Sequence, residues 1–201
     1  MRFLPLLAAA LAAVLAVVVP VAAGASPAIV TVTGFDGRPL EGAVVTLTMP
    51  GVAAPAPRGA YVMKQQNIAF APHILIVPVG ASVSFPNLDR VRHHVYSFSA
   101  PRKFDLKLYG REEDRSIVFD RPGAVALGCN IHDAMNGVLY VVATPYAAVT
   151  GADGRVRIDV DAAGRGTLAV WHPSIRAPGN VLSQPATVAA AGLSTAVRLQ
   201  R

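Results

Sequence analysis

The chain alternates short apolar runs with turn residues over most of its length. Seven runs lie between residues 60 and 143, and Pro, Gly, Asn or Asp separates most of them: 68–70, 73–77, 81–85, 94–98, 116–119, 124–127 and 137–142. Short runs rich in Val, Ile and Phe predict strands, and their spacing favours a β-sandwich. We therefore expect an all-β fold rather than a helical bundle.

The first 25 residues follow a different pattern. Arg2 precedes an apolar run from Phe3 to Val19, and a stretch of small residues ends at Ala25. This order predicts a secretory signal peptide over residues 1–25, with cleavage after Ala25. The alternative is an uncleaved anchor, since an apolar stretch of this length can span a bilayer. Cleavage would leave a soluble periplasmic protein without a stable membrane anchor.

A seven-residue motif occurs twice, as Val32-Thr-Gly-Phe-Asp-Gly-Arg38 and Val149-Thr-Gly-Ala-Asp-Gly-Arg155. Each Asp-Gly pair predicts a hairpin whose glycine has positive φ. Strand-like runs follow at 43–49, 156–160 and 167–171. Two unrelated hairpins are one interpretation. The other is a β-sandwich split by an insertion.

In the split arrangement, residues 28–57 and 146–201 form one domain and residues 60–143 form the inserted one. Pro50–Gly59 and Thr144–Tyr146 would be the junctions, because linkers are rich in Pro and Gly. The outer segments resemble carboxypeptidase-regulatory and transthyretin-like domains. That resemblance rests on Gly37-Arg-Pro-Leu-Glu-Gly-Ala-Val-Val45, the second Asp-Gly-Arg turn and Trp171-His-Pro173, and it implies a small regulatory-like β-sandwich.

Composition removes several classes of function. The 201 residues carry a net charge of +6, but no run of cations interleaves with aromatic residues, so nucleic-acid binding gains no support. The single Cys excludes an intramolecular disulfide, sites with several thiolates and a two-copper centre. The chain also lacks the G-x-S-x-G and H-E-x-x-H motifs of hydrolases and the His-x-His pairs of multicopper oxidases. We therefore expect a protein that is not an enzyme.

One segment carries metal-binding chemistry, Cys129-Asn-Ile-His132-Asp-Ala-Met135. A tight turn of this length can direct its thiol, imidazole and thioether to one point. One more imidazole, from His93 or His94, would complete the two-histidine, one-cysteine set with a weak axial Met that blue-copper sites use. Each residue alone usually has a structural role, whereas the combination favours a metal site. We expect His73 and His172 to be structural.

Residues 62 to 142 resemble the cupredoxins, most closely the amicyanin and plastocyanin group. The matching motifs are Phe70-Ala-Pro72 with Leu75, Val77 and Gly80, then Val83-Ser-Phe85-Pro-Asn87, and the short C-x-x-H-x-x-M loop of the amicyanin form. The resemblance implies a Greek-key β-sandwich that holds one type 1 copper ion through His93, Cys129, His132 and Met135. The whole chain resembles proteins labelled methylamine utilisation proteins, which combine such a domain with a regulatory-like one.

The chain departs from the cupredoxin pattern by having His94 where the family has an Asn that braces the Cys loop. The interval from Asn87 favours His93 as the ligand, and strand alternation then directs His94 to the opposite face.

The expected function is one-electron transfer between redox partners. His132 is the candidate exit for the electron, with Ala134, Met135 and Val91 as apolar surroundings, while Arg90 and Arg92 would steer an acidic redox partner. One alternative is a periplasmic copper chaperone or storage protein. The other is a secreted β-sandwich binding module without a metal.

Overall fold

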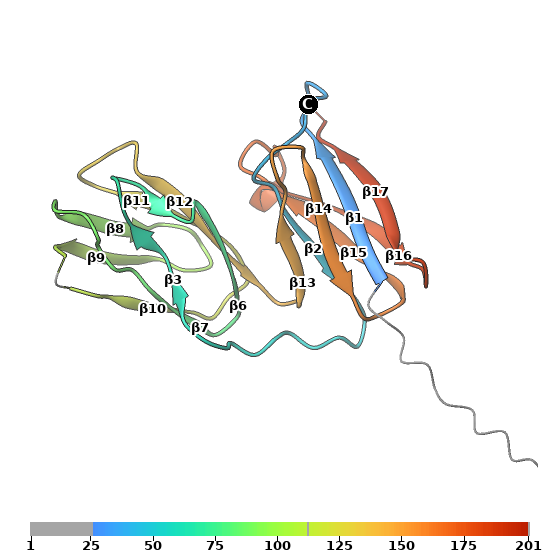
Figure 1. Cartoon of the computed structure of the whole chain (residues 1–201), viewed down its shortest axis with the longest axis horizontal. Helices are drawn as coiled ribbons and strands as arrows, with labels where there is room; N and C mark the ends of the chain where they lie inside the picture. Colours follow the sequence, from blue (N-terminus) through green and yellow to red (C-terminus); the bar gives the residue numbers. More distant parts are fainter. Residues whose placement is uncertain (1–25, 112, 201) are drawn as a thin grey trace, which may run out of the picture.

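The computed structural model describes residues 26–111 and 113–200, so the predicted signal peptide lies outside the described residues. The fold is all-β, as expected, and its only helical element in the described ranges is a single 3-10 turn at Pro178–Asn180. Figure 1 shows two lobes. We call residues 61–142 the inner lobe, and residues 26–49 with 146–199 the outer lobe. No helix in the described part of the chain has the length and hydropathy of a membrane span.

The inner lobe contains two main sheets. One has the strand order β6-β12-β11-β8-β9, the other has the order β10-β7-β3, and β4 and β5 form a small ribbon. The strands are β3 (Tyr61–Val62), β4 (Lys64–Gln65), β5 (Phe70–Ala71), β6 (Ile74–Pro78), β7 (Ala81–Ser84), β8 (His93–Ser97), β9 (Phe104–Tyr109), β10 (Ser116–Phe119), β11 (Gly123–Cys129) and β12 (Asn136–Val142). Alternate residues of these strands point inward and form one apolar core, as half-buried strands require.

One prediction for the inner lobe needs correction. The run 68–70 is mostly a turn, because Asn67 and Ile68 both have positive φ and β5 begins only at Phe70. Strand β9 was not predicted, although apolar and polar residues alternate from Phe104 to Leu108. Lys107 has a positive φ, and after it the buried position shifts, so that Tyr109 is buried and Leu108 is exposed.

The outer lobe is a second sandwich. Its sheets have the orders β14-β1-β17 and β13-β2-β15-β16, and a separate apolar core lies between them. The strands are β1 (Ser26–Thr33), β2 (Val44–Thr48), β13 (Tyr146–Val149), β14 (Arg155–Val160), β15 (Gly164–Trp171), β16 (Val181–Val188) and β17 (Leu193–Arg198). Strand β17 lies parallel to β1, and the other pairings in these two sheets are antiparallel.

The repeated motif forms turns, but the hairpin prediction is wrong. Gly37 and Gly154 have φ of 80° and 69°, as an Asp-Gly turn requires. However, β1 pairs with β14 and β17, whereas β2 pairs with β13 and β15. Each turn therefore carries the chain from one sheet to the other. The two turns lie side by side, and Val32 N donates a 2.7 Å hydrogen bond to Gly154 O.

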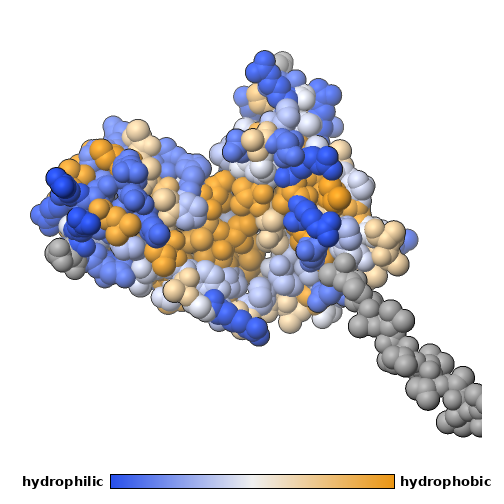
Figure 2. All heavy atoms as spheres, viewed as in Figure 1, coloured by the Kyte–Doolittle hydropathy of each residue, from blue (hydrophilic) through white to orange (hydrophobic). Residues whose placement is uncertain are grey.

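The two lobes meet through an apolar junction. Alternation along β12 directs Leu139 and Val141 into the inner core, while Tyr140 and Val142 join a second cluster that includes Trp171 of the outer lobe. The rings of Tyr140 and Trp171 lie 5.5 Å apart. In Figure 2 apolar residues gather where the lobes meet. Strand β12 therefore leads from the predicted ligand loop directly into the packing between the lobes.

Candidate metal centre

The structure brings three of the predicted ligands together at one end of the inner lobe. His93 is the first residue of β8, Cys129 is the last residue of β11, and His132 lies in the turn that leads to β12. One nitrogen of each ring and the Cys129 sulfur all lie within 4.8 Å of one another. It is the only group of three or more His, Cys, Asp or Glu side chains with this spacing in the described ranges. We call it the ligand cluster.

The spacing and burial of the ligand cluster fit a metal ion. His93 Nδ1 lies 3.8 Å from Cys129 Sγ, and donors about 2.0–2.3 Å from one shared ion are separated by roughly that distance. The rings of His93 and His132 are 5.2 Å apart and meet edge to face. His132 Nδ1 is buried and has no hydrogen-bond partner among the described residues, although buried polar atoms usually have one. A metal would satisfy this nitrogen.

Met135 closes the loop that carries the cluster. Its backbone N–H donates a 2.9 Å hydrogen bond to His132 O, which makes a tight turn between the two residues. The Met135 side chain is only 1% exposed and packs in the same core as Cys129. Met135 therefore lies buried on the same loop as His132, and its thioether is a soft donor of the kind that suits copper.

Strand alternation separates the two adjacent histidines. His93 is fully buried in the ligand cluster. His94 is directed away from it, and His94 Nε2 lies 2.5 Å from Asp105 Oδ1. The backbone of His94 still contacts the ligand loop, because His94 O accepts a hydrogen bond from Asn130 N.

Asp89 fixes the orientation of the His93 ring, a role that was not predicted from the sequence. Asp89 Oδ2 lies 2.9 Å from His93 Nε2. Because an ionised carboxylate only accepts hydrogen bonds, Nε2 carries the proton and Nδ1 presents its lone pair to the cluster. The Asp89 carboxylate also accepts hydrogen bonds from Asn67 N and Ile68 N. Its spacing of four residues before His93 was the available signal.

The pKa of Asp89 reflects the same contacts. Partial burial opposes ionisation of the carboxyl group, but the hydrogen bonds from Ile68 N, His93 and Asn67 N outweigh it and lower the pKa. The carboxylate is therefore the stable form at neutral pH. Buried Asn87 holds the backbone of the loop that carries Asp89. Asn87 Oδ1 accepts a hydrogen bond from Asp89 N, and Asn87 Nδ2 donates hydrogen bonds to Val91 O and Tyr109 O.

The surface around the cluster differs partly from the expectation. Ala134 and Val91 are exposed as predicted, and Arg90 and Arg92 are exposed beside them. The prediction that Met135 contributes apolar surface is wrong, because the core encloses it. Three further large apolar side chains, which were not predicted, are exposed in these loops together with Val91: Ile68, Leu88 and Ile131. His132 itself is half-buried.

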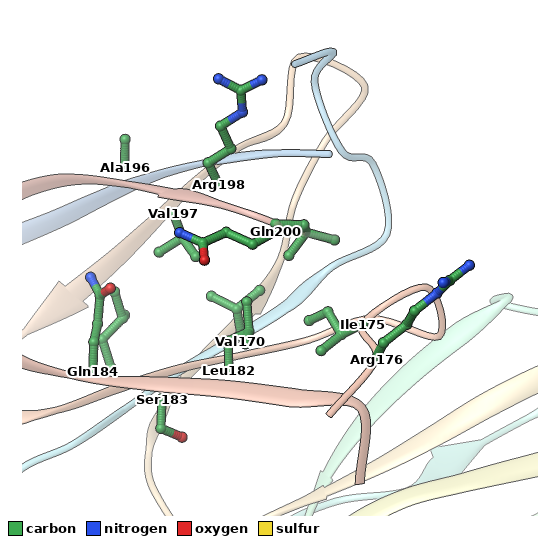
Figure 3. A pocket seen from close by; sticks show the side chains of 12 residues that line it. Val170, Ile175, Arg176, Leu182, Ser183, Gln184, Ala196, Val197, Arg198 and Gln200 are labelled. Atoms are coloured by element: carbon green, nitrogen blue, oxygen red, sulfur yellow. The ribbon is translucent and has the colours of Figure 1, made fainter. Parts of the chain in front are cut away.

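The remaining hollows carry no comparable donor set. His73 and His172 both line a hollow of about 480 Å³ between the lobes. Within the described residues, neither belongs to a group of side chains that could hold a metal ion. A hollow of about 380 Å³ lies between β16 and β17 (Figure 3), and its lining contains no His, Cys, Asp or Glu. Its apolar floor includes Val170, Ile175 and Leu182, while Arg176 and Arg198 point outward (Figure 3).

Comparison with known proteins gives structural likenesses at low identity. No family model and no curated protein matches the chain. A purple cupredoxin from Nitrosopumilus maritimus is similar over 41% of this chain and 99% of its own, with 21% identity and a TM-score of 0.37. A Cu(I) amicyanin variant is similar over 49% of this chain and 98% of its own, with 22% identity and a TM-score of 0.39. A copper-containing nitrite reductase from Thermus scotoductus SA-01 shares 24% identity, with a TM-score of 0.40, over 55% of this chain and 28% of its own.

Proposed function

We propose that this chain is a periplasmic type 1 copper protein that carries single electrons between redox partners and is not an enzyme. The observation that carries the proposal is the convergence of His93, Cys129 and His132, with buried Met135 on the same loop. A copper ion would supply a one-electron couple at this position. Two sulfur donors favour Cu(I), and imidazoles accept both oxidation states.

Each side chain would have a separate task. The Asp89 carboxylate holds the His93 ring in one tautomer, and ligand basicity rises when a carboxylate accepts the second ring proton. The enclosing core keeps water from Cys129 and Met135. His132 is the half-buried member of the ligand cluster, whereas His93 and Cys129 are buried, so the His132 ring would be the path by which an electron leaves.

The exposed surface near His132 suits a transient partner. Val91 and Ile131 are 45% and 51% exposed, and brief redox encounters use small interfaces. Exposed Arg90 and Arg92 lie within three residues of His93 and would attract an acidic redox protein through long-range charge steering.

Copper loading tests the proposal directly. The wild-type chain with one equivalent of Cu(II) is expected to develop an intense visible absorption band and a type 1 EPR signal. Cys129→Ser and His93→Gln should both lose the band. His94→Gln is the matched control, because His94 points away from the cluster, and it should keep the band.

A colourless wild-type protein, or a band that survives in Cys129→Ser, would refute the copper assignment and favour a binding module without metal. Rapid loss of copper to a chelator from a coloured protein would instead favour copper delivery or storage over electron transfer.

A further inference from the structure

A basic hollow lies at the end of the inner lobe opposite the ligand cluster. It has a volume of about 440 Å³ and is lined by Ala100, Pro101, Arg102, Lys103, Asp120 and Arg121. These residues come from the loop after β8 and the turn before β11. Strand β11 ends at Cys129 and begins at Gly123, so roughly 20 Å of strand, at about 3.3 Å per residue, separates the hollow from the cluster.

Positive charge in the hollow is not neutralised by the protein. Three cations and one carboxylate line it, which leaves a surplus of about two charges at neutral pH. Across residues 26–111 and 113–200, none of Arg102, Lys103, Arg121 and Asp120 takes part in an ion pair. A hollow with this charge and no internal partner suits a doubly charged anion.

Arg102 supplies a second, independent observation. Its Nε is buried and has no hydrogen-bond partner among the described residues, and a buried donor left in this state costs about 1–3 kcal/mol. A guanidinium presents its donors in a fixed fork that matches the oxygens of carboxylate and phosphate groups.

The backbone around the hollow is already held in place. Arg102 N donates to Ser99 O, and Ser99 Oγ accepts a hydrogen bond from Ala126 N of β11. The two loops also touch, because a Cβ added to Gly123 would lie 3.0 Å from Pro101 Cγ. An anion would therefore enter a site whose walls need little rearrangement, which lowers the entropic cost of binding.

We infer that this hollow binds a phosphate-type oxyanion, with Arg102 and Arg121 as hydrogen-bond donors and Lys103 as an added charge. The phosphate is either free inorganic phosphate or the headgroup of an anionic lipid, since both present the same oxygens. Because the hollow and the ligand cluster lie at opposite ends of the lobe, binding here leaves His132 accessible to a partner.

The test uses the metal-free mature chain, so its result is independent of the copper proposal. Inorganic phosphate is titrated by calorimetry in about 150 mM NaCl, where non-specific attraction is screened. Vesicles of phosphatidylglycerol and of phosphatidylcholine are tested in parallel by sedimentation. Arg102→Gln and Arg121→Gln are compared with Arg165→Gln, a matched control that removes an exposed arginine of β15 with no ion pair to another described residue.

Saturable binding of phosphate or of phosphatidylglycerol vesicles is expected, and each hollow variant should weaken it at least tenfold while Arg165→Gln does not change it. Phosphate binding without vesicle binding identifies the free anion, and the reverse identifies the lipid headgroup. Absence of both refutes the inference. Equal losses in Arg165→Gln and Arg102→Gln also refute it, because they would show an effect of net charge alone.

Discussion

Replacement of Asp89 by Asn tests how the protein prepares His93 for a metal. The Asp89 carboxylate accepts hydrogen bonds from Asn67 N, Ile68 N and His93 Nε2. An Asn side chain has the same shape but only one acceptor oxygen, and its NH₂ group donates. Asn67 N donates to Oδ1, whereas Ile68 N donates to Oδ2, the oxygen that lies beside His93 Nε2. If the amide oxygen of the variant takes the place of Oδ1 and keeps the bond from Asn67 N, the NH₂ group faces both Ile68 N and His93 Nε2. The proton of the ring must then move to Nδ1, which removes the lone pair directed at Cys129.

The expected effects follow from the contacts that are lost. Hydrogen bonds to charged groups contribute about 1.5–3 kcal/mol each, and neutral ones about 0.5–1.5. The Asn side chain retains part of this set, so we expect Asp89→Asn to lower the free energy of unfolding by about 2–3 kcal/mol. Loss of such a partner typically weakens metal binding about 10–100-fold.

Three measurements on the variant separate these effects. Urea unfolding of the metal-free chain gives the stability change, two-dimensional ¹⁵N NMR reports the tautomer of His93, and competition with a chelator gives the Cu(I) affinity. Asp105→Asn is the matched control, because Asp105 contacts His94 in the same way outside the cluster. The reasoning is refuted if Asp89→Asn keeps the proton on Nε2 and binds Cu(I) as tightly as the Asp105 variant does.

Three further predictions concern the fold. Gly154→Ala should lower stability by roughly 2 kcal/mol more than Gly51→Ala in chemical unfolding, because both residues have positive φ but only the new Cβ at 154 meets a backbone oxygen, Val32 O, at 2.4 Å. Trp171→Ala should cost about 3–5 kcal/mol in the same assay because the side chain is buried between the lobes, and a loss below about 1 kcal/mol would contradict that packing. Burial lowers the pKa of His172 below its usual 6.5, so the unfolded chain binds more protons below that pH and stability falls as pH drops from about 6.5. Melting temperature against pH should show this loss in the wild type and not in His172→Gln.

Local chemistry explains what could be predicted from the sequence. Alternating apolar residues revealed most strands of the inner lobe, since each strand buries one face. The interval between Asn87 and His93, together with alternation, placed His93 inside and His94 outside, as the structure has them. The Asp-Gly pairs were recognised as turns because only a few residue types adopt positive φ easily.

Long-range choices could not be predicted in the same way. A turn motif does not reveal whether its flanking strands pair with each other, and those beside Gly37 and Gly154 enter different sheets. The burial of Met135 could not be predicted, because it depends on how the core of the inner lobe packs around its loop. The backbone amides of Asn67 and Ile68, about twenty residues earlier, hold the Asp89 carboxylate in place, and the spacing between Asp89 and His93 carries no information about those contacts.

The pairing of β1 has a consequence for how the chain reaches its final form. Ala28 and Val30 lie opposite residues of β14 and β17, and the entire inner lobe is synthesised between them. Contacts so distant in sequence close late, because a long loop must first lose its freedom. The inner lobe can therefore form its core before β1 and β2 pair with β13, β14, β15 and β17. The outer lobe completes its sheets only after β17 has been synthesised.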